Sequence, residues 1–271
     1  MSRVLITGGA GKVAKLLRSR LAAPDRVLRL LDIRAPEPAG PGEAVECVTA
    51  SVTDLDAMTE ACRGVDAIVH LGGQAREADV DTVLHNNMLG SYTVMEAARR
   101  AGVTRVVLAS SSHAVGFHDR HSGELPLRGD LDGRPDTLYG WSKMAAEGVG
   151  RLYVDRFGMD VICLRIGLWF PTPPGVRGLA LWLSPDDGAR LVEACLSVES
   201  PGFRCVWGIS RNTRRWWSLA EGEAIGYHPK DDAERFAEQL IAEHGEPDWE
   251  HDPVLNRVGG QWCDVPLGVA Y

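Results

Sequence analysis

Two residues with complementary chemistry, Tyr139 and Lys143, stand four positions apart in the segment Tyr139-Gly-Trp-Ser-Lys143. On a helix this spacing places both side chains on one face. A neighbouring ammonium group favours the charged form of a phenol, which can then accept a proton near neutral pH. The pair therefore predicts a general base. The alternative is an ordinary tyrosine and lysine on a solvated helix surface.

A glycine-rich turn near the N-terminus predicts a second function, the binding of a pyrophosphate. The apolar run Val4–Ile6 leads into Thr7-Gly8-Gly-Ala-Gly11, and a helical pattern follows. Backbone N–H groups and the dipole at the start of a helix bind phosphate groups. Gly8 and Gly11 stand where a tight turn and a close approach are needed, and Ala14 where a third small residue lets the helix pack on the strand. A turn without a ligand is the alternative, but the turn and the base together predict a nicotinamide-dependent oxidoreductase.

The rest of the chain alternates apolar runs with helical patterns, which predicts an α/β fold, a Rossmann-type doubly wound parallel sheet. Strands are expected at 4–6, 26–31, 67–71, 105–109 and 160–166, with helices near 12–22, 54–63, 81–101 and 138–157. Beyond Gly167 we expect a helix at 184–196, a strand at 204–208, a helix near 230–244 and an irregular end. Residues 1–167 are thus interpreted as an NAD-binding Rossmann domain, and 168–271 as a small substrate-binding cap region interleaved with the core.

Composition excludes several classes of function. The net charge of −8 disfavours nucleic-acid binding, and no apolar run approaches the roughly 18 residues that span a bilayer, so neither a nucleic acid nor a membrane is an expected partner. The six cysteines form no C-x-x-C pair and no secretory segment is present, which predicts buried thiols in a reducing, cytoplasmic compartment. No spacing predicts a metal site.

Asp32 stands 21 positions after Gly11, at the end of the second expected strand. A carboxylate there accepts hydrogen bonds from ribose hydroxyls and repels a 2′-phosphate, which favours NAD over NADP. Arg34 is a nearby guanidinium that could accept such a phosphate, and a capping or surface role is the plain alternative for Asp32. His70-Leu-Gly-Gly73 brings bare backbone close to the switch point of the sheet, with His70 expected as a packed strand-end residue.

Together these residues resemble the extended short-chain dehydrogenase/reductase family, also known as the NAD-dependent epimerase/dehydratase family. The resemblance covers essentially the whole chain, and within the family the chain is most similar to the uronate dehydrogenases. The segments that carry it are Thr7-Gly-x-x-Gly-x-x-Ala14, Ile68–Gly73, Asn87-x-x-Gly90, Ala109–Gly116, Arg134–Lys143, Arg165–Gly167, Val206–Ser210 and Trp216-Trp217.

The resemblance implies an enzyme that uses NAD to oxidise a hexuronic acid, glucuronate or galacturonate, at C1 to an aldarolactone. Tyr139 would be the general base, Lys143 would lower the pKa of the phenol and bond the nicotinamide ribose, and Ser111 would hold the reacting hydroxyl. The residues implied to contact NAD are Gly8, Gly11, Lys12, Val13, Asp32, Ile33, Ser51, Val52, Leu71, Gly72, Gly73, Asn87, Ser110, Tyr139, Lys143 and Ile166. For Asn87 the expected role is to support the sheet or a proton path rather than to touch the substrate.

A uronic acid also requires a group that binds its carboxylate. Arg177 occupies the matching place, since a guanidinium can bond both carboxylate oxygens, although a surface arginine is the alternative. The full set implied to contact the sugar acid is Gln74, Ser111, Ser112, His113, Tyr139 and Arg177. His113 could instead organise only its own loop.

The chain departs from the uronate dehydrogenase pattern at Ala75, Ser112 and Leu168-Trp169, and at Ser51, where an aspartate typically contacts adenine. With Trp169 and Phe170 near its mouth, a more apolar pocket could prefer a less hydroxylated acid or a modified sugar. A nucleotide-sugar epimerase or dehydratase and a catalytically silent NAD sensor or scaffold remain alternatives. The helices near 81–101 and 138–157 are expected to pair between subunits of a homo-oligomer.

Overall fold

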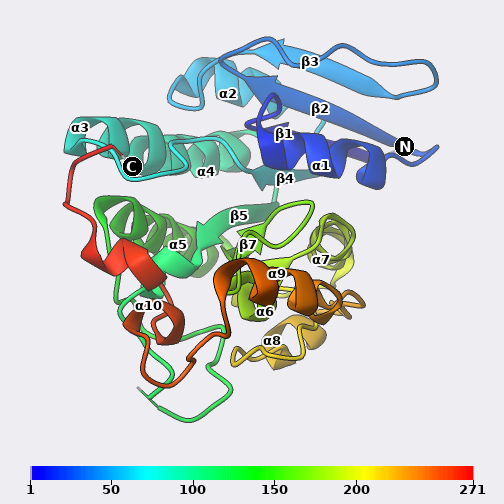
Figure 1. Ribbon diagram of the computed structural model, residues 1–271. Helices are drawn as coiled ribbons and strands as arrows, with labels where there is room; N and C mark the ends of the chain where they lie inside the picture. Colours follow the sequence, from blue (N-terminus) through cyan, green and yellow to red (C-terminus); the bar gives the residue numbers. More distant parts are fainter. Residues whose placement is uncertain (1, 122, 271) are drawn as a thin grey trace.

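The computed structural model describes residues 2–121 and 123–270. Its centre is a parallel sheet of seven strands in the order β3-β2-β1-β4-β5-β6-β9, which confirms the predicted doubly wound arrangement (Figure 1). Chain order reverses between β1 and β4, so the switch point lies beyond the carboxyl ends of these two strands. The strands are Ser2–Thr7 (β1), Arg26–Asp32 (β2), Val45–Thr49 (β3), Ala67–His70 (β4), Arg105–Ser111 (β5), Asp160–Ile166 (β6) and Phe203–Gly208 (β9); Leu168–Trp169 (β7) and Trp182–Leu183 (β8) form a separate ribbon.

Helices cover both faces of the sheet, and alternate strand residues pack against them. Ile6 and its neighbours on one face pack with α1 (Lys12–Leu21) and α7 (Pro185–Ser197). Leu5 and its neighbours on the other face pack with α2 (Leu55–Ala61), α4 (Gly90–Ala101) and α5 (Leu138–Phe157). Because both faces are buried, the central strands are continuous apolar runs.

The structure differs from the sequence-based expectations in several elements. Strand β3 was not expected, because it is a short edge strand that follows a Pro- and Gly-rich loop and is only partly buried. The helix expected near 81–101 is three consecutive pieces: α3 (Val80–Val83), a π-helical turn (Leu84–Leu89) and α4. The helix expected near 230–244 begins later, with a 3₁₀ turn at Ala233–Phe236 and then α9 (Ala237–His244), because the Asp232 side chain caps the turn by accepting from Glu234 N.

The thiols were also expected to be buried, and two of them are not. Cys47 is exposed on edge strand β3 and Cys263 is half-buried, while Cys62, Cys163, Cys195 and Cys205 are buried. All six are free thiols.

The C-terminal part of the chain packs beyond the carboxyl ends of β5 and β6 and also supplies β9 to the main sheet. It contains α6 (Gly178–Leu181), α8 (Ala220–Glu223), α9, α10 (Pro253–Asn256) and a 3₁₀ turn at Gly260–Asp264. The last described segment, red in Figure 1, runs from α10 past α5, and Gly268 N donates to Glu77 in the loop after β4. Within the described ranges, no helix combines the length and the apolar character that crossing a membrane requires.

Candidate active site

The glycine turn after β1 lies in direct contact with the turn after β4. Gly8 has a φ of +70°, and a Cβ atom there would lie 2.9 Å from Gly72 N. Gly11 N donates to Gly8 O at 2.9 Å, and Gly11 caps α1 without a side-chain hydrogen bond. The first N–H groups of α1 are therefore left to bind an anion.

Asp32 at the end of β2 supports this turn from the side. Its Oδ2 accepts from Ala10 N at 3.1 Å and its Oδ1 from Arg34 N at 3.0 Å. The Arg34 side chain is 74% exposed, with its Nε 4.0 Å from the carboxylate. Each carboxylate oxygen keeps a further lone pair, so Asp32 can still accept from a ligand hydroxyl.

His70 is buried at the end of β4 and bonds to the neighbouring strand β1, as expected for a packed residue. Its Nδ1 lies 2.7 Å from Thr7 Oγ1, which also accepts from Gly72 N at 3.1 Å. Burial lowers the pKa of His70 to about 3, with a smaller contribution from the Lys143 charge, so the ring is neutral. This arrangement fixes the switch point of the sheet.

The N-terminus of α5 is held by two side chains. Thr137 Oγ1 accepts from Gly140 N at 2.9 Å. The buried Glu77 carboxylate, from the loop after β4, accepts from Leu138 N at 3.3 Å and from Tyr139 N at 2.8 Å. A carboxylate at a helix N-terminus is stabilised by the helix dipole, so Glu77 fixes the backbone of Tyr139.

Tyr139, Ser111 and Lys143 meet at the carboxyl end of β5. Burial raises the pKa of Tyr139 to about 12, while a hydrogen bond with the Ser111 side chain acts in the opposite direction. Lys143 Nζ donates to Ala109 O at 2.8 Å and lies 5.6 Å from the centre of the Tyr139 ring. Burial lowers the pKa of Lys143 to about 8. The sequence placed these three groups in one site, and the structure brings them together.

Ser110 and Asn87 have side chains that are already occupied. Ser110 Oγ donates to Glu147 Oε1 at 2.6 Å, inside a buried pair between Glu147 and Arg165. The Asn87 amide accepts from Gln74 N at 2.7 Å and donates to Gln74 O at 3.0 Å and to Ser142 Oγ at 2.8 Å. Asn87 therefore supports the loop after β4. Ser110 could contact a ligand only through its backbone groups, because its side chain is bonded to Glu147.

Above these residues lies a cavity of about 680 Å³ between the strand ends and the C-terminal segment. Twelve sequence-predicted residues line it: Val13, Leu71, Gly73, Gln74, Ser110, Ser111, Ser112, His113, Tyr139, Lys143, Ile166 and Arg177. The others lie outside its lining, around the ends of β1 to β4 or on the π-helical turn before α4: Gly8, Gly11, Lys12, Asp32, Ile33, Ser51, Val52, Gly72 and Asn87. Phe170 lines the cavity, but Trp169 was wrongly expected there, because it is buried against Gly188, where a Cβ atom would lie 2.1 Å from its ring.

Sequence reasoning missed the residues that close the cavity from the C-terminal segment, among them Gly259, Gln261 and Trp262. The Trp262 ring stacks on His113 with centres 4.2 Å apart and lies 5.9 Å from the Tyr139 ring. It also missed Arg76, which is exposed and lines the cavity from the loop after β4. The tail had no periodic pattern, so nothing in the sequence indicated where it lies.

The cavity is lined by cations and by no carboxylate among the described residues. Arg76, Lys143 and Arg177 contribute the positive charges, in a chain whose net charge is −8. Arg177 Nη2 donates to Val258 O, its Nε is buried without a hydrogen-bond partner, and burial lowers its pKa to about 10. A guanidinium in this state favours binding of an anion.

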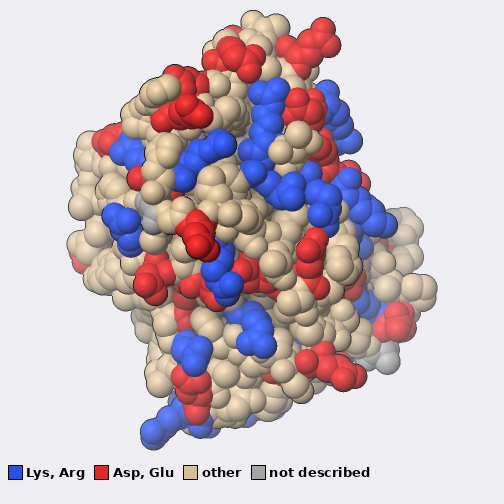
Figure 2. Space-filling view, turned by 90° about the horizontal axis from the view of Figure 1, so that it is seen from below, with Lys and Arg blue, Asp and Glu red and all other residues tan. Residues whose placement is uncertain are grey.

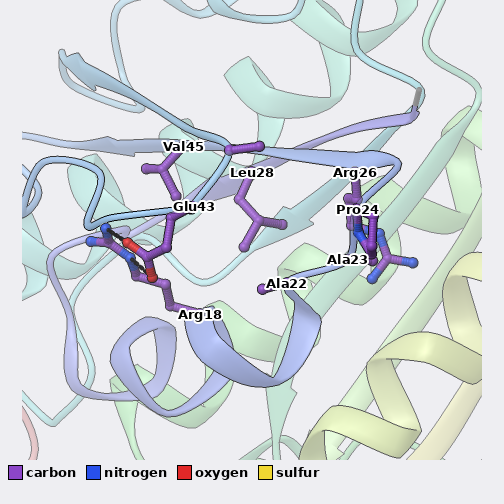
Figure 3. A pocket seen from close by; sticks show the side chains of 10 residues that line it. Arg18, Ala22, Ala23, Pro24, Arg26, Leu28, Glu43 and Val45 are labelled. Atoms are coloured by element: carbon purple, nitrogen blue, oxygen red, sulfur yellow. Dashed lines mark hydrogen bonds and ion pairs between the residues drawn. The ribbon is translucent and has the colours of Figure 1, made fainter.

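Other charged regions are internally paired. A smaller cavity of about 350 Å³ beside α1 and β2 contains Arg18 and Arg26, but Arg18 binds Glu43 (Figure 3) and Arg26 binds Glu193. Three arginines follow β9 at positions 211, 214 and 215, and of these Arg211 pairs with Glu223 and Arg214 with Glu234. Acidic and basic side chains are likewise interspersed on the face in Figure 2. The cavity above Tyr139 is therefore the best candidate for chemistry.

Comparison with known proteins agrees with this arrangement. A model of the NAD dependent epimerase/dehydratase family matches residues 4–173. A uronate dehydrogenase of Agrobacterium fabrum is 38% identical over 267 residues, 98% of each chain. An NAD-dependent glucose-6-phosphate dehydrogenase of Haloferax volcanii is 36% identical over 252 residues, 86% of this chain and 95% of that one. The solved structure of a uronate dehydrogenase variant from Agrobacterium tumefaciens, complexed with NAD, matches with a TM-score of 0.89 and 37% identity, covering 98% of each chain.

Proposed function

The chain belongs to the NAD-dependent epimerase/dehydratase family, and on this basis we propose that it is a dehydrogenase that uses NAD to oxidise a hexuronic acid. The reaction takes the C1 hydroxyl of the cyclic sugar to a carbonyl while the ring stays closed. The product is therefore an aldarolactone. The uronate dehydrogenase relatives support this substrate class over others in the family.

The observation that carries the proposal is the charge of the cavity beside the Tyr139 hydroxyl. Arg177 supplies a guanidinium that makes no ion pair with a described residue and whose Nε is unpaired, although the buried Asp136 carboxylate favours its charged form; no carboxylate lines the cavity within the described ranges. A planar guanidinium can bond both oxygens of a substrate carboxylate. A carboxylate bound at Arg177 would place the sugar ring between Arg177 and Tyr139, with Gln74, Ser112 and His113 as its polar neighbours.

The residues around the glycine turn fit NAD. The uncapped start of α1 offers N–H groups to a pyrophosphate, and bare backbone at Gly8 and Gly72 leaves room for close approach. Asp32 would accept from the adenosine ribose. NAD supplies the acceptor for the hydride that leaves C1.

The protein's own groups handle the proton. Tyr139 accepts the C1 hydroxyl proton, and Ser111 holds that hydroxyl by a hydrogen bond. Since burial raises the pKa of Tyr139 to about 12, the phenol needs nearby stabilisation to act as a base, which the Lys143 ammonium and the Ser111 bond supply.

A substrate panel tests the proposal. The protein is mixed with NAD and with glucuronate, galacturonate, neutral aldoses, glucose 6-phosphate and nucleotide sugars, while absorbance of the reduced cofactor is followed. We expect reduction with a free uronic acid, lost in Tyr139→Phe. Reduction with the sugar phosphate alone, isomerisation of a nucleotide sugar without net reduction, or NAD binding without turnover would each replace the proposal with a different function.

We also propose that the protein is a homo-oligomer. Apolar side chains are exposed on neighbouring helical surfaces, namely Leu84 and Leu89 on the π-helical turn, Tyr92 on α4, and Leu152 and Phe157 on α5. Such a patch favours contact with a second copy. Light scattering of the purified protein tests this, with a monomer at micromolar concentration as the contrary result.

A further inference from the structure

A buried carboxylate lies directly behind the sugar-facing side of the cavity. Asp136 precedes α5, and its side chain is fully buried. Its Oδ2 lies 2.7 Å from His113 Nδ1, and its Oδ1 accepts from Thr137 Oγ1 at 2.9 Å. Cβ atoms at Gly116 and Gly259 would lie 2.0 Å and 1.9 Å from Oδ2, so these two positions have room only for glycine.

These contacts fix the proton on the His113 ring. A carboxylate accepts and does not donate, so in the neutral ring Nδ1 carries the proton and Nε2 is an acceptor. Nε2 makes no hydrogen bond within the described residues, and the ring borders the cavity. Stacking on Trp262 holds the plane of the ring.

We propose that Asp136 is a positioning residue that keeps His113 Nε2 as a fixed hydrogen-bond acceptor for one hydroxyl of the sugar acid. Of the other ionisable groups that line the cavity, Arg76, Lys143 and Arg177 are donors when charged, Tyr139 is assigned to the C1 hydroxyl, and His244 lies at the end of α9. His113 therefore selects a substrate that donates a hydrogen bond at its position, which neither a deoxy nor a fluoro sugar can do. The choice of a sugar acid as the ligand rests on the proposed function, but the position of the proton on the His113 ring does not.

The variant Asp136→Asn should move the proton of the His113 ring from Nδ1 to Nε2. Thr137 Oγ1 accepts from Gly140 N and gives its own proton to the Oδ1 position, so the amide oxygen of asparagine must take that place. The amide NH₂ group then faces His113 Nδ1 and donates to it. The ring proton moves to Nε2, which becomes a donor toward the cavity.

Kinetics with uronic acids that carry fluorine in place of a single hydroxyl at C2, C3 or C4 test this, at about pH 8.5, where imidazole is ordinarily neutral. For the original protein, kcat/KM should fall about tenfold at one of these positions, because fluorine cannot donate. In Asp136→Asn this loss should shrink to within about threefold, while the ratios at the other positions stay unchanged. Asp130→Asn, the same change at a half-exposed site paired with Arg128, is the matched control and should keep the original pattern. If folded Asp136→Asn shows the same loss of kcat/KM at each fluorinated position as the original protein, the proposal is overturned.

A second measurement needs neither Asp136→Asn nor a substrate. Nitrogen NMR of the histidine side chains, assigned with His113→Asn, should show a proton on Nδ1 and none on Nε2 of His113. A proton on Nε2 at this pH overturns the proposal even if Asp136→Asn does not fold. If no uronic acid is oxidised but the ring has the expected proton, the proposed function fails and the role of Asp136 in fixing the ring stands.

Discussion

Replacing Arg177 by methionine tests the anion-binding role of the cavity most directly. The change removes the charge and keeps an unbranched side chain of similar length. Burial lowers the pKa of Arg177 to about 10, against an ordinary value of 12.5. At about 1.4 kcal/mol for each pKa unit, the cavity disfavours the charged guanidinium by about 3 kcal/mol. A bound carboxylate recovers energy of this order.

We therefore expect Arg177→Met to lower kcat/KM for a uronic acid by about a hundredfold, which corresponds to about 3 kcal/mol. A neutral aldose has no carboxylate to lose, so its kcat/KM should change by less than about threefold. Binding of NAD should stay the same. The free energy of unfolding should change by no more than about 1 kcal/mol, because the hydrogen bond to Val258 O is lost but a desolvated charge is removed as well.

The assay is initial-rate kinetics with a uronate and its neutral aldose, together with NAD titration and thermal melting of both proteins. Arg177→Lys is the matched control, since it keeps the charge but not the two-pronged geometry, and should lie between the original protein and Arg177→Met. An equal loss for the acid and the neutral sugar would refute the reasoning, because it would show a general disturbance of the site.

Three further changes probe the structure around the site. Lys143→Met should raise the free energy of unfolding by about 2 kcal/mol at pH 7, and urea titrations should show this gain in stability shrinking toward pH 10. The pKa of Lys143 is about 8 in the folded protein and 10.5 ordinarily, so between these pH values the unfolded chain binds more protons and the original protein gains stability as pH rises. Arg165→Met should cost about 3 to 5 kcal/mol by leaving Glu147 buried and unpaired, and adding Glu147→Gln should restore part of it; a double variant no more stable than the single one would contradict the pairing. Gly259→Ala should cost about 2 kcal/mol and weaken sugar binding, since its Cβ atom would lie 1.9 Å from a buried carboxylate oxygen, whereas Gly148→Ala in open space on α5 should stabilise by about 0.5 to 1 kcal/mol; calorimetry giving equal effects would count against the tight packing.

Patterns that act over one turn of chain were predictable. The glycine turn at Gly8 and Gly11 needs only a positive φ and small residues, and the structure shows both. Tyr139 and Lys143 were predicted to share a helix face because four residues make about one helical turn. The burial of β1 on both faces was visible as a continuous apolar run.

Contacts between distant segments were not predictable. Glu77 binds the backbone of Tyr139, which is 62 positions away. Asp136 binds His113 across 23 positions, and nothing in the spacing of the two residues indicates it. Edge strand β3 carries only a weak pattern, since much of it is exposed.

The sequence by itself determined the central strands of the sheet, the glycine turn and the pairing of the proposed base with its ammonium neighbour, because each depends on helix or strand periodicity and on residues close together in the chain. Only the tertiary structure decided what surrounds that base: the loop after β4, the guanidinium of Arg177 and the C-terminal segment with Trp262. Their positions follow from long-range packing and from burial, which lowers the pKa of Arg177 and leaves its Nε without a partner. A linear pattern does not encode burial between segments that meet only after folding.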